Sequence, residues 1–187
     1  GGAPLNGNDV RPSPPIRSES AGRYHATLAS VLGTASRILW IGDVPDDIAD
    51  AGSPERCIEG MTFPGVMGSP THTAVPPLAE GAYEVAVCNL VDLGVLAHVL
   101  PVVRAALRAD GRLIIGLANV TTPKDPVSSL RATLAVNGYV IEDARVVRGE
   151  HTDVTATGPR VSHQLDELLA LPVDPSAESY VVATAVV

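Results

Sequence analysis

Apolar residues along the chain follow two alternating patterns. Continuous apolar runs, typical of strands buried on both faces of a sheet, predict strands over residues 37–41, 56–61, 83–90, 112–117, 139–148 and 179–187. Apolar residues recurring at spacings of three and four predict helices over residues 23–33, 93–107, 127–136 and 161–171, and one or two helical turns over 46–51. Turn signals at 110–111 and 137–138 are expected to close the second and third of these helices.

Three segments carry neither pattern. Residues 1–22 are rich in proline, glycine and polar residues, which predicts a flexible N-terminal arm ahead of a single domain over residues 23–187. Residues 62–80 contain four prolines and are expected to form a loop, with room for one short strand around 66–67. Residues 151–159 are polar and are also expected to form a loop.

The alternation of strand and helix predicts an α/β fold with a doubly wound, mostly parallel sheet, in which the last two strands are free to form a hairpin edge. The first strand ends at Gly42 and is followed by an acidic loop that reaches Asp47. Ligands of such sheets bind in the crevice outside the carboxyl ends of the strands. The loop over residues 42–47 is therefore the expected position of a ligand site.

Composition narrows the classes of function. The chain has 13 basic and 21 acidic residues and a net charge of -8, which repels phosphate backbones and acidic lipid and argues against nucleic acid or a membrane as partner. Its two cysteines, Cys57 and Cys88, are too few for a disulfide framework and lie in apolar runs. A reducing, cytoplasmic setting is expected.

Three segments carry a resemblance to a known family: RILWIGDVPD, VPPLAEGAYEVAVCNLVDLGVLAHVLPVVRAALRADGRLIIGLANV and AVNGYVIEDARVV. In this order they resemble the first strand and glycine loop, the fourth strand with its helix and fifth strand, and the sixth strand of class I S-adenosylmethionine-dependent methyltransferases. The resemblance implies a Rossmann-like sheet of methyltransferase type with an antiparallel last strand. It also implies S-adenosylmethionine as a possible cofactor.

The departures from that family gather at the cofactor loop. On the family's acidic-x-Gly-x-Gly-x-Gly pattern, Trp40 replaces the carboxylate, Gly42 keeps its glycine, and Val44 and Asp46 occupy the next two glycine positions. A β-branched residue is poorly tolerated at the positive φ that glycine allows. The resemblance therefore implies a degenerate cofactor loop, in which Asp43 is one of the acids that can substitute for the missing carboxylate.

The resemblance also nominates a set of cofactor contacts. Glu59 falls near the end of the second strand, where a carboxylate can reach a ribose, and Ser69 stands where an acidic residue often contacts the adenine edge. Asn89 ends the strand over residues 83–90, and it either lines a pocket or caps a turn. The nominated contacts are Gly42, Asp43, Glu59, Ser69 and Asn89.

Other side chains offer no chemistry of their own. Trp40 is expected to fill the core, and His98 lies on a helix packed against the sheet, where a structural role is expected rather than catalysis. His151 and Asp153 are too few to ligate a metal, so no metal is expected. Asn119, like Asn89, either lines a pocket or caps a turn, and no catalytic residue is identified.

Two functions fit these residues. The first is a methyltransferase-like domain that no longer transfers methyl groups and acts as a binding or assembly partner of an active relative, of a biosynthetic enzyme or of a second copy of itself. The alternative is an active S-adenosylmethionine-dependent methyltransferase for a small-molecule acceptor, in which catalysis rests on placing donor and acceptor in line. The loss of two loop glycines favours the first.

Overall fold

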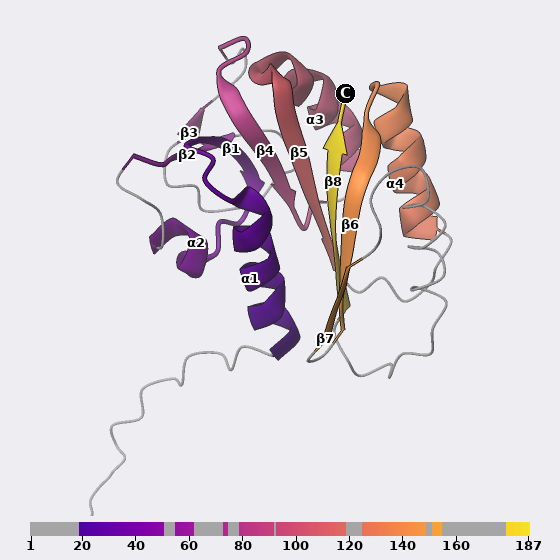
Figure 1. The fold of residues 1–187 in the computed structure, drawn as a ribbon. Helices are drawn as coiled ribbons and strands as arrows, with labels where there is room; N and C mark the ends of the chain where they lie inside the picture. Colours follow the sequence, from indigo (N-terminus) through magenta and orange to yellow (C-terminus); the bar gives the residue numbers. More distant parts are fainter. Residues whose placement is uncertain are drawn as a thin grey trace, which may run out of the picture.

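The computed structural model describes residues 19–50, 55–61, 73–74, 79–91, 93–118, 125–148, 151–154 and 179–187. These residues form one eight-stranded sheet, in the order β3-β2-β1-β4-β5-β8-β6-β7, with helices on both faces (Figure 1). The elements are α1 (Glu19–Leu32), β1 (Arg37–Gly42), α2 (Asp46–Asp50), β2 (Cys57–Met61), β3 (Thr73–Ala74), β4 (Tyr83–Asn89), α3 (Leu93–Ala106), β5 (Leu107–Ala118), α4 (Asp125–Val136), β6 (Val140–Arg148), β7 (His151–Val154) and β8 (Ser179–Val186).

The central strands are mostly apolar because both faces of the sheet are covered. In β1, Ile38 and Trp40 belong to one buried cluster and Leu39 and Ile41 to a second cluster on the opposite face. This alternation follows from the two-residue period of a strand. Burial on both faces explains why the sequence shows continuous apolar runs instead of alternating ones.

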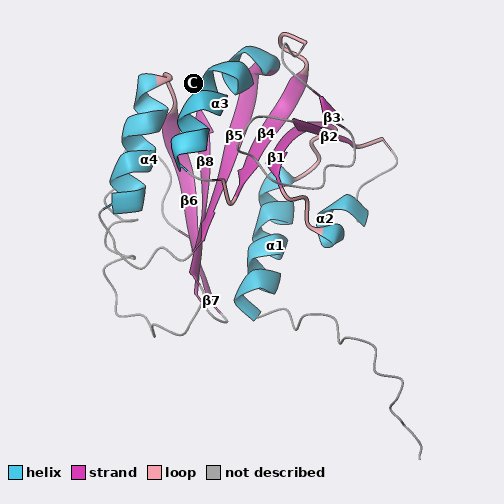
Figure 2. Cartoon of the chain, turned by 180° about the vertical axis from the view of Figure 1, so that it is seen from behind, coloured by secondary structure: helices cyan, strands magenta, loops and turns pink. Residues whose placement is uncertain are grey.

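Each face is covered by its own pair of helices (Figures 1 and 2). Leu28 of α1 and Ile48 of α2 join the cluster that contains Trp40, whereas Leu100 of α3 and Leu130 of α4 join the other. We call these two surfaces the α1 face and the α3 face. None of the described helices is long and apolar enough to span a membrane.

The direction of the strands matches the prediction. β1 runs parallel to β2 and β4, and β4 runs parallel to β5. β8 lies antiparallel between β5 and β6. The predicted doubly wound, mostly parallel sheet with an antiparallel last strand is therefore confirmed, and the last two predicted strands do pair with each other. The edge beyond them, however, is formed by β7.

The first helix starts earlier than its apolar spacing indicates. α1 begins at Glu19, so residues 19–22 are helical although the sequence assigned them to the arm. Ser20 is buried and Ala21 packs against the α1-face cluster, so packing stabilises a turn that periodicity alone does not identify. The remainder of the predicted arm lies outside the described residues.

The end of α3 also differs from the prediction. α3 ends at Ala106 and β5 begins at the next residue, so the expected turn at 110–111 lies inside a strand. β4 pairs with Leu107 and then, two residues further along, with Arg112, which leaves residues 108–111 as a bulge. Pairing of Leu107 with the neighbouring strand ends the helix before the turn signal is reached.

Two short strands occur where the sequence predicted loops. β7 pairs antiparallel with β6, from Val154 opposite Arg145 to His151 opposite Arg148. An edge strand needs only one neighbour, which makes its polar composition acceptable. β3 adds a two-residue strand beside β2. The strand predicted at 66–67 and the helix predicted over 161–171 lie outside the described residues.

Candidate functional site

The sheet reverses its strand order between β1 and β4. From β1 the order runs outward to β3, and from β4 it runs outward through β5. The ligand crevice of an open α/β sheet lies at the carboxyl ends of the strands where the order reverses. Gly42 ends β1 directly opposite Asn89, which ends β4. We call the space at these two strand ends the carboxyl-end crevice.

Gly42 brings the ends of β1 and β4 into backbone contact. It has a φ of 99°, and a Cβ atom on it would overlap with the carbonyl oxygen of Asn89. Only glycine fits this position. Leu90, the next residue after β4, has a φ of 56°, a left-handed conformation that side chains disfavour. Its N–H donates to the Gly116 carbonyl at 3.0 Å, so the chain after β4 is anchored to β5.

The loop after β1 is held through the carbonyl oxygen of Asp43. This oxygen accepts a hydrogen bond from Trp40 Nε1 at 2.8 Å and another from Asn89 Nδ2 at 2.7 Å. Trp40 is completely buried, so its predicted core role is confirmed, and its indole N–H fixes the loop in addition. The backbone of Asp43 is consequently fastened to both β1 and β4.

Tyr24 of α1 completes this network from the α1 face. Its hydroxyl donates to Asn89 Oδ1 at 2.5 Å, so both ends of the Asn89 amide are engaged, and Asn89 is only 4 % exposed. The Tyr24 ring stacks on Tyr180 with centroids 4.4 Å apart and occupies the space that a Cβ on Gly116 would fill. Burial raises the pKa of Tyr24 far above its ordinary value, which keeps the hydroxyl a neutral donor.

We call Tyr24, Asn89, Asp43 and Trp40 the clamp. It joins α1, β4 and the loop after β1 through three hydrogen bonds. Sequence reasoning left open whether Asn89 lines a pocket or caps a turn. In the structure its amide ties the loop to the helix.

Glu59 lies at the centre of β2, and its carboxylate is bound by residues from the amino ends of β1 and β4. Its carboxylate accepts a hydrogen bond from the Tyr83 hydroxyl and lies 3.6 Å from Arg37 Nη2. Arg37 also stands over the Tyr83 ring, 5.5 Å from the centroid. Burial and the hydrogen bond with Glu59 raise the pKa of Tyr83 to about 12. Arg37 and Tyr83 are the first residues of β1 and β4.

The loop after Gly42 presents exposed carboxylates. Asp43, Asp46 and Asp47 are exposed, while Val44 packs against the α1-face cluster. The Asp47 carboxylate lies 3.8 Å from Nδ1 of His25 on α1, a partner that the sequence did not predict. Negative charge in the first turn of α2 is favourable at a helix N-terminus.

The other side chains weighed from the sequence lie either outside the described residues or on other elements. Ser69 and Asn119 lie outside the described residues, and His98 is exposed on α3. His151 and Asp153 belong to β7. Over the described ranges, no group of three or more histidine, cysteine, aspartate or glutamate side chains is placed to hold a metal ion.

No protein-family model matches the sequence, and neither does any curated protein sequence. Solved structures do match. The [4+2]-cyclase SpnF superposes with a TM-score of 0.56 at 15% identity, over 93% of this chain and 84% of that one. A SAM-dependent methyltransferase from Aquifex aeolicus gives a TM-score of 0.52 at 8% identity, over 87% and 89% of the two chains. The Burkholderia thailandensis 1,6-didemethyltoxoflavin-N1-methyltransferase, with bound S-adenosylhomocysteine, gives a TM-score of 0.51 at 13% identity, over 89% of this chain and 77% of that one.

The fold is that of the class I S-adenosylmethionine-dependent methyltransferases. At these identities the likeness concerns the fold alone. Within this methyltransferase fold, the sequence places Tyr24 in the predicted helix over residues 23–33 but does not reveal its hydrogen bond to Asn89. The sequence does contain an indication of this bond, because the polar groups of a tyrosine and an asparagine in otherwise apolar segments need hydrogen-bond partners when they are buried. Their separation of 65 residues hides the pairing.

Proposed function

We propose that this protein is a methyltransferase-fold domain that does not use S-adenosylmethionine and that acts as a binding or assembly partner of a biosynthetic enzyme. The observation that carries the proposal is the clamp. Tyr24, Trp40 and Asn89 direct their polar groups at one another and at the Asp43 backbone. A cofactor entering between β1 and β4 would have to displace these buried hydrogen bonds, and leaving a buried polar group unpaired is unfavourable.

Two further features support the proposal. Gly42, the one glycine kept from the family's loop pattern, is used for contact between β1 and β4. Glu59, the carboxylate nominated for a ribose, is already bound by Arg37 and Tyr83. Gly42 and Glu59, two of the nominated contacts, therefore already make interactions within the protein that compete with cofactor binding.

An active methyltransferase is the second candidate, and the exposed acidic loop favours it. S-adenosylmethionine carries a sulfonium and an ammonium group, and the carboxylates of Asp43, Asp46 and Asp47 are exposed beside the crevice. A fold supports many unrelated activities, and a [4+2]-cyclase is among the similar structures. Methyl transfer therefore does not follow from the fold, and the clamp argues against it.

Thermal unfolding with and without S-adenosylmethionine or S-adenosylhomocysteine tests the cofactor half of this proposal. A ligand that binds only the folded state raises the midpoint, and the rise grows with the logarithm of the ligand concentration above the dissociation constant. We expect no change at millimolar concentrations of either compound. A concentration-dependent rise with both compounds would overturn the proposal in favour of the second candidate.

Sedimentation velocity over a range of protein concentrations tests the partner half. A second copy of the chain as partner predicts a concentration-dependent shift from monomer to dimer by mass action. A protein that stays monomeric requires a different polypeptide as its partner. A monomer that also binds S-adenosylmethionine would contradict the assembly role.

A further inference from the structure

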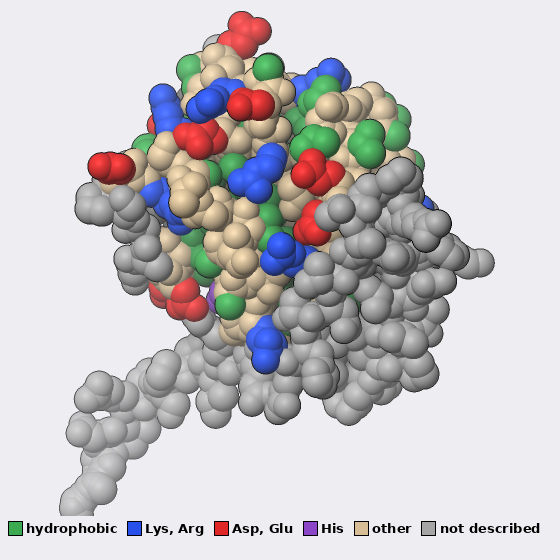
Figure 3. Space-filling view, viewed as in Figure 1, with side chains coloured by type: hydrophobic (Ala, Val, Ile, Leu, Met, Phe, Trp, Pro, Cys, Tyr) green, Lys and Arg blue, Asp and Glu red, His purple; other side chains and the backbone are tan. Residues whose placement is uncertain are grey.

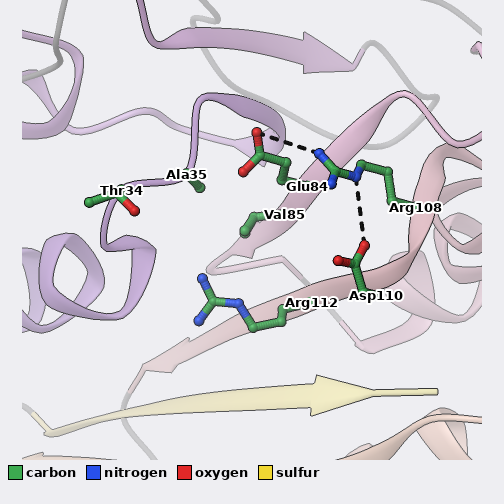
Figure 4. Close-up of a pocket in the computed structure, with 7 residues that line it drawn as sticks. All are labelled: Thr34, Ala35, Glu84, Val85, Arg108, Asp110 and Arg112. Carbon is green, nitrogen blue, oxygen red and sulfur yellow. Dashed lines mark ion pairs between the residues drawn. The ribbon is translucent and has the colours of Figure 1, made fainter.

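A cavity lies at the opposite end of the sheet from the clamp. It has a volume of about 160 Å³ and is lined by Thr34, Ala35, Glu84, Val85, Arg108, Asp110 and Arg112 (Figure 4). These residues come from the α1–β1 connection, the start of β4 and the first half of β5. We call this space the amino-end cavity. Toward the top of Figure 3, basic and acidic side chains lie side by side over this end of the sheet.

The bulge in β5 builds one wall of the amino-end cavity. Residues 108–111 leave the ladder with β4 and carry Arg108 and Asp110 to the rim. A Cβ on Gly111 would lie 2.9 Å from the Arg108 carbonyl oxygen and 3.1 Å from the Leu107 side chain, so the bulge folds back on itself tightly. Bulges of this kind re-aim side chains at sites next to a sheet.

The acidic groups around the cavity are held in place by partners at its rim. Glu84 accepts a hydrogen bond from Ser36 Oγ at 2.6 Å and lies 3.7 Å from Arg108 Nη1. Arg108 Nε also lies 3.6 Å from Asp110 Oδ1. The Ser36 hydrogen bond lowers the pKa of Glu84, which keeps it ionised. The Glu84 carboxylate also accepts backbone hydrogen bonds from Ser36 and Arg37, whereas the ion pair with Arg108 uses only Oδ1 of Asp110.

The basic side chain of Arg112 is also held in place by a hydrogen bond. Arg112 Nη1 donates to the Val31 carbonyl at the end of α1, at 3.2 Å, which orients the guanidinium. A guanidinium presents five N–H donors, so donors remain beyond the one bound to Val31. The exposed Thr34 lines the cavity on the side of the α1–β1 connection (Figure 4).

We propose that the amino-end cavity binds a small zwitterion of the free α-amino acid class, with its carboxylate at Arg112 and Thr34 and its ammonium group at Glu84 and Asp110. The lining carries two acidic and two basic side chains, so neither a simple anion nor a simple cation is favoured. The cavity volume of about 160 Å³ restricts the ligand to a small molecule, and glycine and alanine are the smallest members of this class.

Chemical-shift perturbation in ¹⁵N-labelled protein tests this proposal, with glycine and L-alanine as probes. We expect saturable shifts at the amides of Thr34, Glu84 and Arg112. Glycinamide lacks the carboxylate and N-acetylglycine lacks the ammonium group, and each is expected to bind about tenfold more weakly or worse, because a hydrogen bond to a charged group is lost. Equal responses to all of these compounds, or no response to glycine and alanine, would overturn the proposal.

Variants locate the site. Asp110→Asn removes one charge from an exposed side chain, and Thr34→Val removes the hydroxyl at nearly constant shape. Both are expected to weaken binding, whereas Glu142→Gln, an exposed acid on β6, serves as the matched control and is expected to leave it unchanged. Equal binding by Asp110→Asn, Thr34→Val and the control would contradict the assigned site. The result is independent of S-adenosylmethionine binding, since the clamp lies at the other end of the sheet.

Discussion

The two ends of this sheet differ in the burial of their polar side chains. At the carboxyl end, Tyr24, Trp40 and Asn89 are buried and bond to one another or to backbone. At the amino end, Arg108 and Asp110 are exposed charges at the rim of a cavity. Buried polar groups are costly to leave unpaired, whereas exposed charges remain hydrated. The end where this fold normally binds ligands is thus expected to be the stability-determining one.

The largest effect is expected from Gly42→Ala. The new Cβ would overlap with the Asn89 carbonyl at a φ of 99°, and backbone strain with overpacking is expected to lower the free energy of unfolding by about 3 kcal/mol or more. Gly81→Ala is the matched control, because Gly81 also has a positive φ but a Cβ there would meet nothing within 4 Å. It is expected to cost about 1 kcal/mol. Urea unfolding measures both, and equal losses would refute close backbone contact at the crevice.

Asn89→Ala is expected to have the next largest effect. It leaves the buried Tyr24 hydroxyl without its acceptor and removes one donor from the Asp43 carbonyl, a loss of about 2 kcal/mol. The half-buried Asn137, which donates to the Thr133 carbonyl, is the control, and Asn137→Ala is expected to cost about 1 kcal/mol or less. Chemical denaturation that ranks the two variants in the reverse order would contradict the importance of the clamp.

A double-mutant cycle isolates the bond between α1 and β4. Tyr24→Phe removes only the hydroxyl that donates to Asn89. Because the two residues share one buried hydrogen bond, the combined variant with Asn89→Ala is expected to be less destabilised than the sum of the single variants, by about 1 kcal/mol. Additive losses in the same unfolding assay would mean that the pair is not coupled.

Alkaline pH is expected to weaken the network around Glu59. Because the folded state holds the pKa of Tyr83 at about 12, above the ordinary value of 10.0, the folded protein binds more protons than the unfolded chain between these pH values. The stability from Tyr83 is therefore full below pH 10 and is lost as pH rises through about 12. Tyr83→Phe is expected to flatten this part of the stability curve. An unchanged slope would show that Tyr83 titrates alike in both states.

The smallest effect is expected at the amino end. Asp110→Asn removes an ion pair whose acidic side chain is 82% exposed, and such pairs contribute little, so a change within about 0.5 kcal/mol is expected. Thermal denaturation at low and high salt measures it. A loss of unfolding free energy as large as that of Asn89→Ala would show that the two ends contribute alike to stability.

Regular elements were predictable because their causes are local. The apolar runs of β1, β4 and β5 follow from burial on both faces, and the helical spacing of α3 and α4 follows from packing on one side. The bulge over residues 108–111 was missed because only the pairing of β5 with β4 creates it. β7 was missed because an edge strand needs no apolar pattern.

The site was only partly predictable. Gly42 and Asn89 were correctly placed at the facing strand ends, since position in a parallel sheet follows from strand order. Their interactions depend on Tyr24, a residue from an element before the sheet, and no local pattern marks that contact. Glu59 lies two residues before the end of β2, as the predicted strand over residues 56–61 has it, but its contacts with Arg37 and Tyr83 were not predicted.

Isothermal titration calorimetry with S-adenosylmethionine and S-adenosylhomocysteine tests the central claim most directly, with the SAM-dependent methyltransferase from Aquifex aeolicus as the positive control under the same conditions. The clamp predicts no saturable heat for this chain. A saturable isotherm with a micromolar dissociation constant would contradict it, since the carboxyl-end crevice would then admit the cofactor.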